Sequence, residues 1–107
     1  MTLKEITDKA GLKAFTKVSD KDVSGCYIGD IMSLAMCRVK KNNIWITAQC
    51  SMNTIAVAVL TGAAGVIVCE GFDPEEGTAV RADEENIAVF GSQLSAYELA
   101  EIFAKYI

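Results

Sequence analysis

From residue 44 onward, short runs of apolar residues alternate with segments that have helical spacing. Each strand-like run is apolar throughout, as a parallel sheet with helices on both faces requires. The pattern predicts three β-α units in succession, and their crossovers are expected to be right-handed. The expected strands are residues 44–47, 66–69 and 87–90, and the expected helices are residues 53–61, 75–85 and 95–106.

The first 43 residues have a weaker pattern. Thr2 and Glu5 have the spacing of a capping box at the start of a helix that Gly11 ends. Strands are expected over residues 12–17 and 23–28, and Asp30 is well placed to cap a short helix that runs to the basic pair at 40–41. Together these elements predict a single α/β domain over residues 1–107, with a mostly parallel sheet of about five strands and helices on both faces.

No charged residue occurs between Lys41 and Glu70, and this run resembles a membrane span. The cluster at 49–54 is polar, however, and the apolar stretch at 55–69 has only 15 residues and contains Gly62 and Gly65. A spanning helix needs roughly 20 apolar residues. We therefore expect no membrane segment. The helix over 53–61 is apolar nearly all round, which favours burial under neighbouring elements or in a subunit contact.

Composition narrows the chemistry. A chain of 107 residues with 51% hydrophobic and 22% charged residues has the size and balance of one globular domain. It contains no His, which excludes His-based acid-base catalysis and His-ligated zinc. The motifs GxxxxGK[ST], GxGxxG, HExxH and GxSxG are all missing. We expect no catalytic residues and no cofactor.

The net charge of −4 argues against nucleic acid as a partner, because an acidic domain repels phosphates. The charge is also uneven. Residues 1–53 carry eight basic and five acidic side chains, whereas residues 54–107 carry two basic and nine acidic ones. Two interpretations stay open: solvated faces that differ by chance, or a contact guided by complementary fields.

The four cysteines are widely spaced, with no CxxC pair, so a zinc or iron-sulfur site is not expected. Each lies among apolar residues, as a buried free thiol does. Buried, reduced thiols and a start without signal-peptide character predict a cytoplasmic protein. Cys50 is the one thiol expected to be exposed at a helix N-terminus, where its pKa would fall, but no general base accompanies it.

Candidate binding residues follow the expected strands. In parallel sheets, ligands bind beyond the carboxyl ends of the strands. Asp30 could orient a ligand hydroxyl there or serve only as a helix cap. Gln49, Ser51 and Asn53 could line a polar pocket, or Ser51 or Asn53 could cap the helix while Gln49 bonds to loop backbone.

A third segment follows the strand at 66–69. Gly71 permits a turn with positive φ, and Pro74 followed by acidic residues is typical of a helix start. Glu70 and Asp73 lack the additional oxygen ligands of a calcium loop, so we expect no metal site. The candidate ligand-binding set is Asp30, Gln49, Cys50, Ser51, Asn53, Glu70 and Gly71.

The arrangement resembles the DRTGG domain family, whose fold is similar to the N-terminal domain of HPr kinase/phosphorylase. The likeness covers nearly the whole chain. It rests on three stretches, the run Ile44-Trp45-Ile46-Thr47 before a polar turn and an Ala/Val-rich helix, the run Ala63-Ala64-Gly65-Val66-Ile67-Val68 leading into Gly71-Phe72-Asp73-Pro74, and the pattern Gly25-x-x-x-x-Asp30-x-x-Ser33. Family members occur alone or attached to CBS-domain pyrophosphatases and phosphate acetyltransferases.

The signature itself differs. Gln49-Cys50-Ser51 stands where the family has its Asp-Arg pair, and Cys69-Glu70-Gly71 stands for Thr-Gly-Gly, so only Gly71 is kept. A family site that used the Arg for an anionic ligand is therefore in doubt here. The resemblance implies a regulatory or accessory domain without catalysis of its own.

These observations lead to competing functional hypotheses. The first is a non-catalytic, homodimeric domain that senses a small ligand, such as a phosphorylated metabolite or a nucleotide. The second is an interaction adaptor that docks a larger partner enzyme through its charged surfaces. The third, an enzyme that uses Cys50, requires a thiol of depressed pKa.

Overall fold

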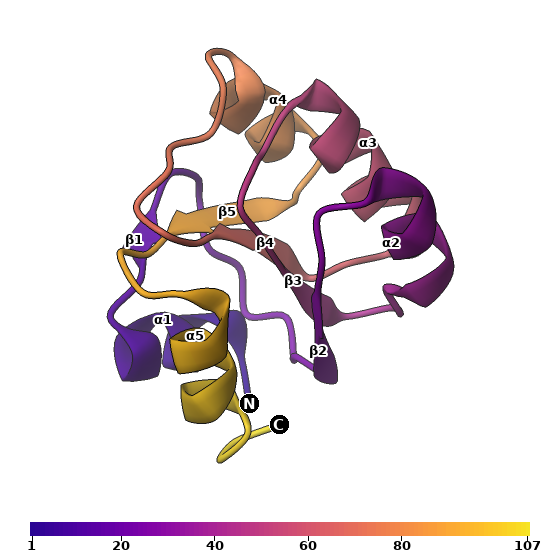
Figure 1. Ribbon diagram of the computed structural model, residues 1–107. Coiled ribbons are helices and arrows are strands. Elements are labelled where there is room, and N and C mark those ends of the chain that lie inside the picture. Colours follow the sequence, from indigo (N-terminus) through magenta and orange to yellow (C-terminus); the bar gives the residue numbers. More distant parts are fainter.

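A computed structural model describes all residues, 1–107, as one five-stranded sheet with helices on both faces. Helices α1 and α5 cover one face, and α2, α3 and α4 cover the other (Figure 1). The elements in chain order are α1 (Leu3–Ala10), β1 (Lys13–Ala14), β2 (Gly25–Ile28), α2 (Met32–Arg38), β3 (Asn43–Thr47), α3 (Met52–Thr61), β4 (Gly65–Val68), α4 (Thr78–Glu84), β5 (Ala88–Gly91) and α5 (Ala96–Phe103). The predicted fold class is confirmed.

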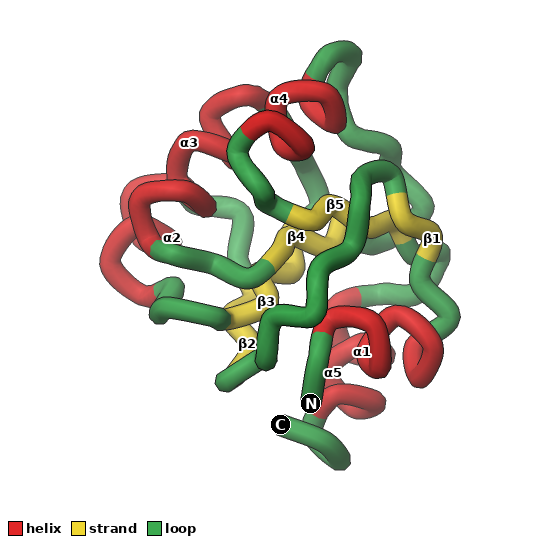
Figure 2. The backbone as a smooth tube through the Cα atoms, turned by 180° about the vertical axis from the view of Figure 1, so that it is seen from behind, coloured by secondary structure: helices red, strands yellow, loops and turns green.

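The strands lie in the order β1-β5-β4-β3-β2, seen from behind in Figure 2. Strands β2 to β5 are parallel, and the pairs Ile44↔Gly65 and Ile46↔Ile67, two residues apart on each strand, show the regular register of β3 on β4. Only β1 is antiparallel, pairing with β5 through Lys13↔Gly91 and Ala14↔Phe90. Consecutive strands β1 and β2 thus lie at opposite edges of the sheet.

Two apolar cores fill the space between sheet and helices. Alternate side chains of each central strand point to opposite faces, so Ile44 and Ile46 join the α1–α5 core while Trp45 joins the α2–α4 core. All three side chains are fully buried. Burial on both faces is the reason that consecutive positions in these strands are apolar, with the buried polar residues Asn43 and Thr47 only at the ends of β3.

Local chemistry sets several helix ends. The predicted capping box at Thr2 and stop at Gly11 are confirmed, whereas the last helix ends at Phe103 and not at residue 106. Thr2, Ser51 and Ser95 each form a capping box. Gly11 and Gly62 end α1 and α3 in the left-handed conformation. Each of these signals lies within one turn of the helix end that it defines.

Two predicted elements are shorter because side chains or loop contacts replace regular backbone bonds. Strand β1 ends at Ala14 because the Thr16 hydroxyl, rather than a backbone carbonyl, accepts from the Val89 N–H, at 2.9 Å. Helix α4 starts at Thr78, not near Pro74, because the Glu75 N–H donates to the Cys50 carbonyl at 2.9 Å and holds the preceding loop. The predicted helix start at Pro74 is wrong.

The expectation for the apolar helix is only partly met. In α3, Ile55 and Ala58 are buried against the sheet, but Met52, Val59 and Leu60 are exposed. None of the five helices combines the length and the apolar character that a membrane-spanning helix needs.

The prediction that Cys26 and Cys37 are buried is wrong. Cys50 and Cys69 are buried, whereas Cys26 and Cys37 are exposed, on the edge strand β2 and on α2. An edge strand and a short surface helix each have one side without a covering layer, so an apolar neighbourhood in sequence does not ensure burial there.

Candidate functional site

The carboxyl ends of β2, β3, β4 and β5 meet at one edge of the sheet, which we call the carboxyl edge: residues 29–30, 47–51, 69–71 and 91–93. Backbone bonds hold the loops together. The Cys69 N–H donates to the Thr47 carbonyl at 3.0 Å, and the Ser92 N–H donates to the Val68 carbonyl at 3.0 Å. Three of the segments singled out in the sequence therefore lie side by side.

Asp30 joins two strand ends and does not cap α2. Its Oδ1 accepts from the Thr47 hydroxyl at 2.7 Å and from the Ala48 N–H at 2.8 Å. The N-cap position of α2 belongs to Ile31, which makes no side-chain capping bond. The capping interpretation of Asp30 is wrong because its carboxylate is already used across the sheet edge. Oδ2 makes no hydrogen bond within the chain, and the residue is exposed.

The polar cluster at 49–54 divides into structural and free side chains. Ser51 caps α3 and exchanges hydrogen bonds with Thr54, so its structural interpretation holds. Gln49 is half-buried, and its Nε2 lies 3.4 Å from the Asp30 carbonyl, a weak contact that fits loop support. Asn53 is exposed and caps nothing. Gln49 and Asn53 are thus the members of the cluster whose side-chain amides remain available to bind a ligand.

Glu70 and Gly71 form a tight turn after β4. Both have positive φ, 63° and 76°, as the sequence led us to expect for Gly71. The Gly71 N–H donates to the Ser92 carbonyl at 2.8 Å, and a Cβ on Gly71 would lie 2.6 Å from Oε1 of Gln93. Glycine is needed here for its conformation and for this close approach.

The two buried thiols are poor nucleophiles. Burial raises the pKa of Cys50 to about 12, and the nearby Glu75 carboxylate adds to the shift. The pKa of Cys69 is also raised, first by burial and then by Glu70 and Asp30. The expectation that Cys50 is exposed with a lowered pKa is wrong, because its side chain lies in the α2–α4 core. The hypothesis of a Cys50 enzyme loses its premise.

The structure therefore brings only part of the candidate set together. Asp30 and Gln49 are in contact, and the negative charges of Asp30 and Glu70 both raise the pKa of the Cys69 thiol. Cys50 points away from this edge into the core. No three Cys, Asp or Glu side chains come together in a way that could hold a metal ion.

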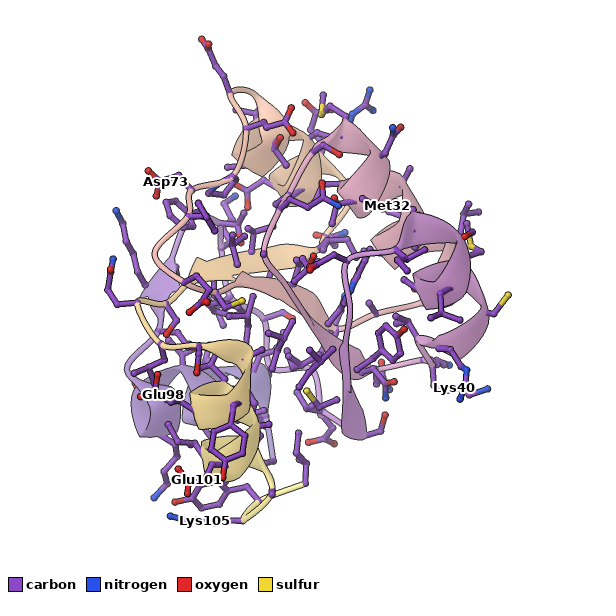
Figure 3. All side chains as sticks on the ribbon, viewed as in Figure 1. Met32, Lys40, Asp73, Glu98, Glu101 and Lys105 are labelled. Atoms are coloured by element: carbon purple, nitrogen blue, oxygen red, sulfur yellow. The ribbon has the colours of Figure 1, made fainter.

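A cleft of about 260 Å³ continues the carboxyl edge toward β1, and sequence reasoning missed it except for Gly71. The Lys13 ammonium lies 4.9 Å from the centroid of the Phe15 ring in this cleft. Figure 3 shows Asp73 on the loop after β4. The lining residues are Gly11, Lys13, Phe15, Gly71, Phe72, Asp73, Gly91, Ser92 and Gln93.

Glycine lets this cleft form. A Cβ on Gly91 would lie 2.7 Å from Cε2 of Phe15, so the ring packs against bare backbone. Ser92 and Gln93 follow the predicted strand at 87–90, with only Gly91 between. The rule that ligands bind beyond parallel strands, applied to that strand as well, would have found them.

Among solved structures, the chain matches a crystal structure that contains the CBS and DRTGG domains of the regulatory region of Clostridium perfringens pyrophosphatase. That structure is a complex with the activator diadenosine tetraphosphate. The match covers 94% of this chain and 45% of that chain, with a TM-score of 0.72 and 16% sequence identity. At this identity the likeness shows the fold alone, and it supports a DRTGG-related fold. No protein-family model matches the sequence, and no curated protein matches it.

Proposed function

We propose that this chain is a regulatory domain that senses a small ligand at its carboxyl edge and catalyses no reaction. The observation that carries the proposal is the cleft beside β1, where one ammonium, one carboxylate, two phenyl rings and two uncharged polar side chains line the same space. Lys13 would bind an anionic group, Phe15 or Phe72 would stack on a planar base, and Ser92 and Gln93 would bond to polar atoms. A nucleotide or another phosphorylated metabolite has these features.

The charge along the edge suits an elongated ligand of that kind. Lys13 and Asp73 line the cleft at the β1 end, and the carboxylates of Asp30 and Glu70 follow the ends of β2 and β4. A phosphate would be repelled by the acidic part, whereas sugar hydroxyls could donate to the unused Oδ2 of Asp30. The solved relative, a regulatory region that binds a nucleotide activator, supports the same class of function.

The site has a direct test in a thermal-shift screen against nucleotides, diadenosine polyphosphates and phosphosugars. A ligand at 100 times its Kd adds about 2.7 kcal/mol to the free energy of unfolding, which is several degrees for a chain of this length. Hits are then repeated with Lys13→Ala and Gln93→Ala for the cleft, and with Gln49→Ala and Asn53→Ala for the polar cluster.

Lys105→Ala is the matched control, because Lys105 lies just beyond α5 and far from the cleft (Figure 3). Loss of the shift in the Lys13 and Gln93 variants alone would locate the ligand in the cleft. Loss in the Gln49 and Asn53 variants alone would locate it at the polar cluster. A screen without any hit would contradict the sensing function.

An adaptor function remains the second candidate, because the loop after β4 exposes four acidic side chains, Glu70, Asp73, Glu75 and Glu76. A basic surface on a larger enzyme would complement this loop. Pull-down at low salt, with loss of the partner at high salt, would favour the adaptor.

Under either function we propose that the chain acts as a homodimer, and measurement of its mass in solution tests this.

A further inference from the structure

Helix α3 exposes an apolar surface, and none of its residues is charged. Leu60 is 72% exposed, Met52 48% and Val59 40%. A groove of about 390 Å³ lies between α3 and α4, and its walls are the apolar side chains of α3 and the pair Arg81 and Glu85 of α4. An uncharged helix that is half exposed lacks the polar outer face of an ordinary surface helix.

The exposed side chains form one continuous stripe. Met52, Ala56, Val59 and Leu60 follow the spacing i, i+4, i+7 and i+8, so they share a face of α3. Ala56, the small residue among them, leaves room for another helix to approach the backbone. Helix α2 lies beside α3 in the same layer (Figure 1) and exposes Leu34 as well, which extends the apolar area.

The charges beside the groove are self-complementary. Arg81 and Glu85 lie one turn apart on α4, with the Arg81 Nη1 3.6 Å from the Glu85 Oε1, and both are about half exposed. A two-fold axis across the groove exchanges the two ends of such a pair. It would bring Arg81 of one copy to Glu85 of the other, as an isologous contact requires.

We propose that a second copy of this chain docks on this face, with α3 packed against the partner's α3 and the Arg81–Glu85 pairs crossing the two-fold axis. The inference rests on the homodimer proposed above and names its surface. A standard interface buries about 800 Å² on each partner, roughly one-seventh of the accessible surface of 5634 Å². The exposed stripe of α3 and the Arg81–Glu85 pair would form the centre of such an interface.

The first test is sedimentation of the whole chain at tens of micromolar, with Leu60→Glu as the disrupting variant. Leu60 is exposed, so the variant should fold normally, as circular dichroism and thermal unfolding will show. A buried charge at a central apolar anchor should raise the dimer Kd about 30-fold or more. Tyr97→Glu is the matched control, because Tyr97 is 76% exposed on α5, in the opposite layer.

The second test uses the charges. Arg81→Glu alone places four acidic side chains at the interface, and Glu85→Arg alone places four basic ones, so each variant should be monomeric. Mixed in equal amounts, the two variants have complementary pairs and should form a heterodimer. This rescue requires the cross-axis pairing itself, because neither variant restores the pair within its own chain.

A wild-type chain that is monomeric at tens of micromolar would overturn the inference. A dimer that survives Leu60→Glu, or variants that do not rescue each other, would assign dimerisation to another face and overturn it as well. The proposed sensing function can be tested independently of the dimer, because the thermal shift that depends on Lys13 can be measured in the Leu60→Glu variant. Its presence there, with the dimer lost, would keep the sensing function while confirming the surface.

Discussion

Replacing Asp30 with alanine removes the side chain that connects the ends of β2 and β3. Two donors lose their acceptor: the Thr47 hydroxyl at 2.7 Å and the Ala48 N–H at 2.8 Å. Thr47 is 1% exposed, so its hydroxyl is left in a buried position without a partner. The half-buried Ala48 N–H can find water instead.

The expected loss of stability follows from these two bonds. A hydrogen bond to a charged group contributes about 1.5–3 kcal/mol, and the exposure of Asp30 places the Thr47 bond at the low end because of solvent screening. The Ala48 bond adds roughly 0.5 kcal/mol. Asp30→Ala should therefore cost about 2 kcal/mol in the free energy of unfolding, or about 10 °C in Tm for a domain of this size.

A double-mutant cycle isolates the pair. Thr47→Val replaces the hydroxyl with a methyl group of similar volume and should cost about 1 kcal/mol. In the double variant no hydroxyl is left unpaired, so the combined cost should be smaller than the sum by about 1 kcal/mol. Asp8→Ala, which removes an exposed carboxylate of α1 that bonds to no side chain or backbone, is the matched control and should cost little.

Urea unfolding followed by Trp45 fluorescence measures these values. Trp45 is the chain's single tryptophan, fully buried, and its Nε1 donates to the Gly29 carbonyl at 2.9 Å, next to Asp30. An unchanged m-value would confirm that the variants alter stability and not the denatured state. A cost for Asp30→Ala below about 0.5 kcal/mol, or strict additivity in the cycle, would refute the reasoning.

Two further predictions concern the core. At pH 8, alkylation of the native protein should spare Cys50, because a pKa of about 12 leaves a thiolate fraction about a thousandfold below that of a free thiol. A Cys50 that mass spectrometry shows to be alkylated rapidly would contradict its burial. Gly65→Ala should cost about 3 kcal/mol, since its Cβ would lie 2.9 Å from the Ala88 carbonyl oxygen of the neighbouring strand. Gly77→Ala meets open space and should cost only about 1 kcal/mol, for its positive φ; equal costs in urea unfolding would count against the steric argument.

The sequence predicts best those features that are decided within a few residues. The capping box at Thr2 and the end at Gly11 were readable because donor and acceptor lie within one helical turn, and the same range contained Ser51 as one of two possible caps. The apolar runs in β3, β4 and β5 were also readable, because burial on both faces favours apolar residues at consecutive positions.

Features decided by distant residues were not readable. Asp30 has the residue type and place of a helix cap, and only Thr47, on another strand, makes it a link between strands. The loop before α4 has the residues of a helix start, but its hydrogen bond to the Cys50 carbonyl holds it in a non-helical conformation. At the site, Gly71 was found from its own conformation, whereas Lys13 reaches the cleft only through the pairing of β1 with β5.

That pairing has a consequence for motion. Strand β1 has two residues and bonds only to β5, so the segment around it has few backbone bonds to break when it opens locally. The cleft has one wall on this segment and the other on the loops after β4 and β5. A molecule bound between the walls must be released before the segment opens. Amide hydrogen exchange near Lys13 should therefore slow in proportion to occupancy, so that the lifetime of an edge strand reports what the cleft holds.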